Sequence, residues 1–165
     1  MLSCETRFHP TRIRFLIDFK KRTLAMSNSF IRQIFLNLPV KDLKKSMAFF
    51  RQLGFEFNQQ FTDDNAACMI ISEQAYVMLL VPPFFQTFTN KQLPDPETHT
   101  GAIFALSCPN RAAVNDMVNQ ALAAGGTPAL DAKDHGFMYA WSFYDVDGHH
   151  WEVMWMDPAA VAPQN

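Results

Sequence analysis

The sequence has few cysteines and glycines, little net charge and no long apolar run. Its 165 residues carry a formal charge of −2, which gives no reason to expect nucleic acid or an anionic membrane as a partner. The three cysteines are scattered and form no C-x-x-C, so they predict reduced thiols and exclude a disulfide framework. The apolar stretch YVMLLVPPFF is too short to span a bilayer. Together these absences predict a soluble, cytoplasmic protein.

The basic residues are concentrated at the start of the chain. Residues 1–25 carry six Lys/Arg and two Asp/Glu, so this segment is net +4 while the remainder is net −6. It lacks the apolar region of a secretory signal, which argues against export. Two interpretations remain: an arginine-rich organellar presequence, or an overextended start before a true initiator at Met26. In both, residues 1–29 are predicted to be an unstructured extension.

A strand–helix–three-strand pattern occurs twice after this segment. In each copy a strand precedes a helix, which begins at an N-cap residue, Asp42 or Asn110, and stops at a glycine, Gly54 or Gly125. The predicted helices are 42–53 and 111–124, and the predicted strands are 31–40, 55–61, 66–72, 75–81, 102–107, 127–130, 136–144 and 149–156. This order of elements is an internal repeat.

A proline-rich segment separates the two copies. Residues 82–100 predict a linker or flap with three phenylalanines that could be buried. One copy alone would expose one face of a four-stranded sheet, so we expect the two to pair. The expected α+β fold is a curved eight-stranded mixed sheet with helices outside and a concave pocket inside. Its predicted domain is 30–158, with modules 30–81 and 101–158 and a tail 159–165.

The stretch FYDVDGHHWEVMWM could hold a metal ion or could turn the chain into its last strand. The pair Asp147-Gly148 is typical of a hairpin turn, so we assign Asp145 and Asp147 to that turn. Because strand side chains alternate, His150, Glu152 and Met154 should share one face. The other face should pack on the second helix and consists of Trp151, Val153 and Trp155. A metal site here would therefore need ligands from elsewhere in the chain.

The duplicated pattern resembles a known family. The start of the first helix, IFLNLPVKDLKKSMAFFRQLGFEF, and the ending GFMYAWSFYDVDGHHWEVMWMDP are similar to the vicinal-oxygen-chelate superfamily over residues 31–158. That superfamily includes glyoxalase I, bleomycin-resistance proteins and extradiol dioxygenases. The resemblance implies the fold described above and a homodimer. It implies several reactions, or binding alone, as the function.

The metal-using members of this superfamily have four ligands, and the resemblance places their counterparts on this chain. They fall at Phe35, Ile103, Glu152 and an apolar residue of the 75–81 strand, Leu79 or Val77. Only Glu152 has a lone pair for a divalent ion, so no cofactor is expected at the usual position. A divalent metal remains possible at a displaced site in which His150 or Gln33 joins Glu152, with His99 reaching in from the linker. The alternative is that these are ordinary polar residues of the sheet.

The remaining residues of the expected pocket predict a binding protein for a small apolar or aromatic molecule. A lone carboxylate could anchor a polar group of that ligand, and aromatic rings could stack on it. The predicted lining residues are Gln33, Phe35, Asn37, Leu79, Ile103, Tyr139, Trp141, Phe143, Glu152 and Met154. The aromatic ones could instead pack in the core or at a dimer interface. An alternative function is a metal-dependent lyase or isomerase similar to lactoylglutathione lyase, a dioxygenase with a displaced metal, or catalysis with Glu152 as general base.

Overall fold

The computed structural model describes residues 31–160, and the predicted extension 1–29 lies wholly outside them. The first half contains β1 (Ile34–Pro39), α2 (Leu43–Gln52), β2 (Glu56–Asn58), the 3-10 turn η1 (Gln59–Phe61), β3 (Ala66–Ile70) and β4 (Ala75–Leu80). Two short helical turns follow, α3 (Pro82–Phe85) and η2 (Gln86–Phe88). The second half contains β5 (Ile103–Ser107), α4 (Arg111–Ala123), β6 (Thr127–Pro128), β7 (Lys133–Asp134), β8 (Met138–Tyr144) and β9 (His150–Met156). No described helix is long and apolar enough to cross a membrane.

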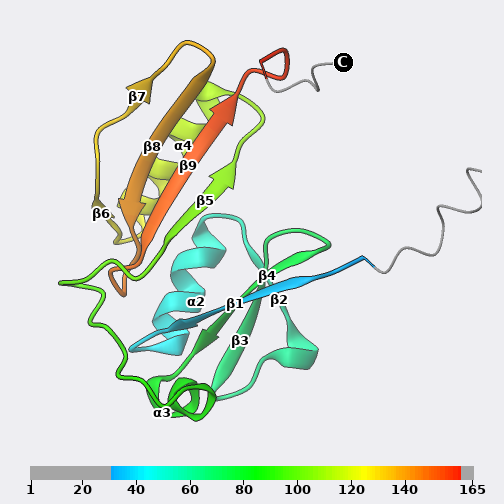
Figure 1. Cartoon of the computed structure of the whole chain (residues 1–165), viewed down its shortest axis with the longest axis vertical. Coiled ribbons are helices and arrows are strands. Elements are labelled where there is room, and N and C mark those ends of the chain that lie inside the picture. Colours follow the sequence, from blue (N-terminus) through cyan, green and yellow to red (C-terminus); the bar gives the residue numbers. More distant parts are fainter. Residues whose placement is uncertain (1–30, 161–165) are drawn as a thin grey trace, which may run out of the picture. The chain divides into compact units, whose positions relative to one another are not determined.

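The strands form two mixed sheets (Figure 1). The first sheet has the order β1-β4-β3-β2, with β1 parallel to β4. The second sheet has the order β5-β9-β8-β6, with β5 parallel to β9, and the short β7 also pairs with β8. The α+β fold class is confirmed, with the strands divided between sheets of four and five strands. The sequence did not predict β7, because a two-residue strand is too short to show alternation.

Both predicted helix starts are confirmed. The side chain of Asp42 accepts a hydrogen bond from the backbone N–H of Lys45 (3.0 Å), and that of Asn110 accepts one from Ala113 (2.8 Å). Each bond satisfies one of the backbone donors that a helix leaves unpaired at its N-terminus. In Figure 1, α4 lies behind β8 and β9. Because α2 packs against β3 and β4 in the same way, each sheet has one face covered by a helix and one face left for a site.

Strand register fixes which side chains meet the helices. Trp151 and Val153 of β9 are fully buried in the core, and Trp155 packs against it, as the alternation predicted. Glu152 lies between them in the chain and therefore points to the opposite face. It pairs with Ala105 of β5 on one side. The predicted register of the last strand is confirmed.

Aromatic side chains from both halves share one core. The ring of Phe50 in α2 lies 5.1 Å from that of Trp151 in β9, nearly edge to face. The ring of Phe49 lies 6.2 Å from that of Phe143 in β8. Such aromatic pairs are worth about 0.5–1.5 kcal/mol beyond the area they bury. The two sheets are thus joined by one hydrophobic cluster.

The β8–β9 hairpin carries two buried carboxylates. Asp145 accepts hydrogen bonds from the backbone N–H groups of Asp147 (2.9 Å) and His149 (3.0 Å), and from the indole of Trp151 (2.9 Å). These contacts confirm its role in the turn. Asp147 has a second role that the sequence did not predict. Its carboxylate points out of the hairpin and binds the start of α2. It accepts from the Lys41 backbone N–H (2.7 Å) and the Ser46 hydroxyl (2.5 Å).

We expect Asp147→Ala to lower the free energy of unfolding by about 1–3 kcal/mol, because it leaves the buried Ser46 hydroxyl and the partly buried Lys41 N–H without their acceptor. Urea denaturation of Asp147→Ala, Ser46→Ala and the double variant measures how the two residues couple. A coupling energy of about 1 kcal/mol is expected for side chains in direct contact. Strictly additive losses would show that the Ser46–Asp147 bond contributes nothing to stability.

Candidate functional site

A cavity with a mostly apolar lining lies on the face of the first sheet opposite α2. It has a volume of about 510 Å³. We call it the aromatic cavity, and it is lined by Phe35, Asn37, Gln60, Phe61, Thr62, Asp63, Ala66, Met78, Leu80, Phe84 and Phe88. Its floor comes from β1, β3 and β4, and its walls come from η1, the following turn, α3 and η2. Its volume falls within the range of small-molecule sites.

Phenylalanine rings stand open around this cavity. Phe35 is 50% exposed and Phe88 is 60% exposed, although a large apolar side chain is normally covered. Phe84 and Phe88 meet edge to face with ring centroids 5.3 Å apart. Pro82 and Pro83 suit the first turn of a helix, where the missing N–H is not needed, so they start α3 and place Phe84 at the wall. The flap predicted from the proline-rich segment therefore contributes two rings to the cavity.

The rim of the aromatic cavity is polar. The side chain of Asp63 accepts from the backbone N–H groups of Asn65 (2.7 Å) and Ala66 (2.9 Å), which fixes the turn before β3. The hydroxyl of Thr62 donates to the carbonyl of Asn58 (2.8 Å). Hydrogen bonds thus hold the rim in place without using all of its polar atoms.

Glu152 borders a separate, smaller cavity on the second sheet, which we call the Glu152 cavity. Its volume is about 80 Å³, and its lining includes Lys133, His135 and Ser142. The segment 130–138 forms part of this lining, held by a bond from the Leu130 N–H to the Ser142 hydroxyl (3.0 Å). This cavity holds only a few non-hydrogen atoms.

Arg111, in the first turn of α4, holds the same segment from its other end. Its guanidinium pairs with Asp134 and donates to the Gly136 carbonyl (2.9 Å). It also lies over the rings of Tyr139 and Trp155, at 5.4 and 5.1 Å from their centroids. The segment that lines the Glu152 cavity is therefore fixed at two points.

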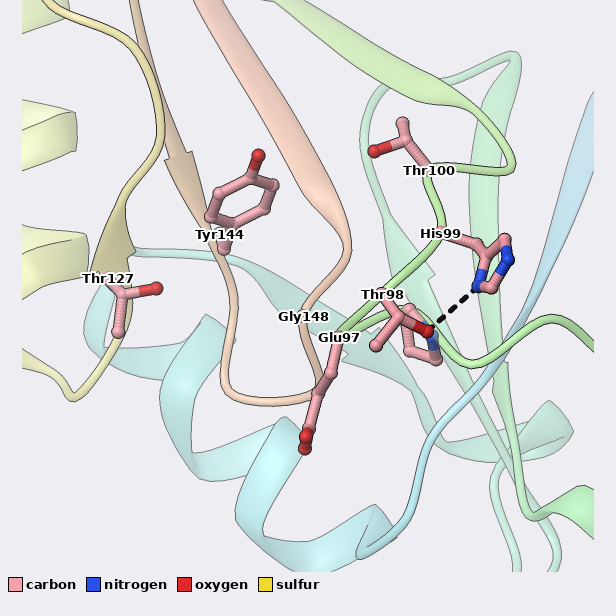
Figure 2. Close-up of a pocket in the computed structure, with 8 residues that line it drawn as sticks. Glu97, Thr98, His99, Thr100, Thr127, Tyr144 and Gly148 are labelled. Atoms are coloured by element: carbon pink, nitrogen blue, oxygen red, sulfur yellow. Dashed lines mark hydrogen bonds between the residues drawn. The ribbon is translucent and has the colours of Figure 1, made fainter.

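A third cavity, the linker cavity, lies between the linker and the end of β8 (Figure 2). Its volume is about 300 Å³. Figure 2 shows the hydroxyl groups of Thr100, Thr127 and Tyr144 around it, while the His99 ring turns away from Tyr144 and contacts Thr98, with 2.8 Å between Nδ1 and the hydroxyl. Glu97 is engaged with Lys41 in an ion pair. This cavity is polar and contains none of the predicted lining residues.

The structure distributes the predicted lining residues unevenly. Phe35 and Asn37 do line the aromatic cavity, but Leu79 does not, because it is fully buried in the core. The register pairs Asn37 with Met78, so Met78 and not Leu79 or Val77 faces the cavity. The sequence did not determine which residues of β4 face the cavity, and the prediction placed Leu79 on the wrong face of this strand.

The aromatic residues of β8 are also corrected. Phe143 is fully buried on the helix side, and the Tyr139 hydroxyl donates to Asn115 of α4 (2.8 Å). Trp141 packs against the core and borders the Glu152 cavity. These rings were expected in the pocket, but they pack in or against the core. Burying them there removes their apolar area from water, which is favourable.

The remaining predicted residues lie apart from the aromatic cavity. Gln33 donates weakly to the Glu73 carbonyl and the Tyr76 hydroxyl (3.4 Å each), and Ile103 is exposed at the start of β5. Met154 shares the face of Glu152 by register. His150 is buried with its ring 5.1 Å from that of Tyr144.

No described group of three or more His, Cys, Asp and Glu side chains could hold a metal ion. The His149 imidazole donates to the Pro39 carbonyl (2.7 Å). At the position that matches Glu152 in the first sheet the chain has Met78, a weak thioether donor. The residues present therefore do not fit the ligand set that the superfamily uses for a divalent ion.

The sequence did not predict that the cavity is also lined by Phe61, Asp63, Met78 and Leu80. Met78 and Leu80 could have been found from alternation once Phe35 was placed opposite Tyr76 in register. No sequence signal placed Phe61 and Asp63 at the cavity, since they reach it through η1 and a turn.

Comparisons with known proteins agree with this architecture. A family model described as bleomycin resistance protein-like N-terminal matches residues 32–72. No curated protein sequence matches the chain. A hypothetical protein from S. aureus is 26% identical with a TM-score of 0.65, and the match covers 76% of this chain and 94% of that one. A glyoxalase-related enzyme from Fulvimarina pelagi is 17% identical with a TM-score of 0.65, over 76% and 88% of the two chains. A lactoylglutathione lyase from Agrobacterium tumefaciens is 19% identical with a TM-score of 0.53, over 78% and 95%.

Two mixed sheets, each with its helix, define an α+β protein with the glyoxalase-like fold. These matches support the resemblance to the vicinal-oxygen-chelate superfamily that the motifs predicted. Identities this low support a shared fold and leave the reaction open, because one fold hosts several chemistries.

Burial raises the pKa of the Asp145 carboxyl above its ordinary value of 3.8, although the His149 imidazole and the Trp151 N–H act in the opposite direction. The folded state therefore favours the protonated form of this carboxyl more than the unfolded state does. Its contribution to the free energy of unfolding should fall as the pH rises from about 3.8 through the folded-state pKa.

Asp145→Asn keeps one oxygen for the two backbone donors and removes the titration. We expect the stability of the wild type, relative to this variant, to decrease from acid to about pH 7, as measured by urea denaturation. A stability difference that rises with pH would contradict the stated sign. Asp116→Asn, on the exposed face of α4, is the control.

Proposed function

We propose that this protein binds a small, flat, apolar or aromatic molecule in the aromatic cavity, without a metal ion. The exposed phenylalanines around a cavity of about 510 Å³ are the observation that carries this proposal. Exposed rings cost free energy in water, and a stacked ligand would recover it. The matching family model, described as bleomycin resistance protein-like, is consistent with a binding role. The proposed setting is the cytoplasm.

A catalytic role has less support. Glu152 borders a cavity of about 80 Å³, and that cavity does not share the rings of the aromatic cavity. A general base must lie within about 2.6–3.2 Å of the proton it removes. Within one chain, the residues that would surround a ligand at Phe35 and Phe88 are not the residues that surround Glu152. Binding is therefore the function that the geometry favours.

We further propose that the protein is a homodimer in which edge strands of two copies pair. Among the described strands, β1 pairs only with β4, and β5 pairs only with β9. Ile34 on β1 is 53% exposed and Ile103 on β5 is 57% exposed. An exposed apolar edge strand is a template for pairing with another chain. Pairing β1 of one copy with β5 of the second would join a four-stranded and a five-stranded sheet into one continuous sheet, in place of the eight-stranded sheet expected from the sequence.

The binding proposal predicts that 10-methylacridone, a neutral flat tricycle, raises the melting temperature in a thermal-shift assay. A ligand that binds only the folded state must stabilise it. Phe88→Ala should weaken the affinity about tenfold, by removal of one stacking ring. Phe137→Ala is the matched control, since Phe137 is also exposed but borders none of the three cavities.

A chelator and Glu152→Gln should both leave this shift unchanged. If instead a divalent ion is required, and Glu152→Gln abolishes its effect, the metal-dependent enzyme becomes the better account. Equal losses in Phe88→Ala and Phe137→Ala would show that the dye does not bind in the aromatic cavity.

The dimer proposal predicts that Ile103→Lys yields a monomer in light scattering coupled to size-exclusion chromatography. A lysine on an edge strand opposes pairing with another strand. The matched control is Leu130→Lys, because Leu130 is also 57% exposed but lies outside β1 and β5. A wild-type protein that is monomeric at micromolar concentrations would overturn this proposal.

A further inference from the structure

The charge on the rim of the aromatic cavity narrows the class of ligand. Among its described lining residues, Asp63 is the sole ionisable one, and no Lys, Arg or His accompanies it. We infer that the ligand is a flat aromatic cation and that Asp63 selects its charge. This inference rests on the proposed binding function and names the ligand class for the same cavity.

The other carboxylates that border the three described cavities are Glu97, Asp131 and Glu152, and all of them have basic neighbours. Glu97 at the linker cavity is paired with Lys41, and the Glu152 cavity includes Lys133 and His135. Asp63 has no basic counterpart in its cavity. A cationic ligand would supply the missing opposite charge.

The Asp63 carboxylate is held in place before any ligand arrives. Its Oδ1 accepts from the N–H groups of Asn65 and Ala66, and its own N–H donates to the Ala66 carbonyl (2.8 Å). Among the described residues no hydrogen bond engages Oδ2. A fixed carboxylate with one oxygen to spare loses little conformational entropy when it meets a charged ligand.

The surrounding rings favour the same charge. The face of an aromatic ring carries negative potential, so a cation above Phe35, Phe61 or Phe84 is attracted where a neutral molecule is only stacked. The rings favour a flat ligand, and the rings together with Asp63 favour a ligand with positive charge. A delocalised ring cation satisfies both requirements at a low desolvation cost.

The experiment compares two fluorescent dyes with the same tricyclic skeleton, 10-methylacridinium, which is a cation, and 10-methylacridone, which is neutral. Fluorescence titration of the full-length protein at low ionic strength should give about tenfold tighter binding of the cation. Asp63→Asn should weaken the cation about threefold and leave the neutral dye unchanged, because an exposed ion pair contributes modestly. Added salt should reduce the preference in the wild type.

The variant and its control separate charge from folding. Asp63→Asn retains an oxygen for the N–H groups of Asn65 and Ala66, so the turn persists. Asp64→Asn removes the adjacent exposed charge, which does not line the cavity, and should change neither dye. Equal loss of both dyes in Asp63→Asn would mean structural damage and would overturn the charge role.

The outcomes also distinguish this inference from the function on which it rests. Equal affinity of the wild type for both dyes would refute the cation preference and leave the binding site in place. If neither dye binds, the binding function itself fails.

Discussion

Two buried carboxylates in one hairpin hold the two sheets of this protein against a shared aromatic core. Asp145 folds the hairpin onto its own backbone and the indole of Trp151, and Asp147 reaches across to the start of α2. The hairpin in turn sets the register of β9, which sends Trp151 into the core and Glu152 to the opposite face. The face of β9 that meets the core therefore follows from a turn that the sequence marks with Asp147-Gly148, whereas the register of β1 with β4 places Phe35 and Met78 at the aromatic cavity.

Strand alternation also gives the open faces of the two sheets different sets of side chains. The first sheet presents open rings, a thioether and one carboxylate at the rim around a cavity of ligand size. The second sheet presents Glu152 in a narrow cavity beside a segment that Arg111 and Ser142 hold. A fold that elsewhere supports metal chemistry here offers two hydrocarbon side chains and one thioether at three of the four expected ligand positions, which favours recognition by stacking and charge.

Local patterns in the sequence predicted much of the fold. The N-caps Asp42 and Asn110, the two helices and the parity of β9 all rest on interactions within a few residues of chain. The site was harder to predict because it depends on register between distant strands. Leu79 was placed on the wrong face of β4, since alternation alone does not say which face meets a helix. The bond from Ser46 to Asp147 joins residues 101 positions apart, and no local pattern signals it.

The central claim is that ligand binding occurs on the rings of the first sheet and needs no metal. Chemical-shift mapping of the ¹⁵N-labelled protein with 10-methylacridinium, in the presence of a chelator, tests it most directly. The account predicts that the perturbed backbone amides cluster at Phe35, Asp63, Met78 and Phe88, while those of Ser142 and Glu152 stay unchanged. Perturbations centred on Glu152, or binding that appears only after a divalent ion is restored, would contradict it.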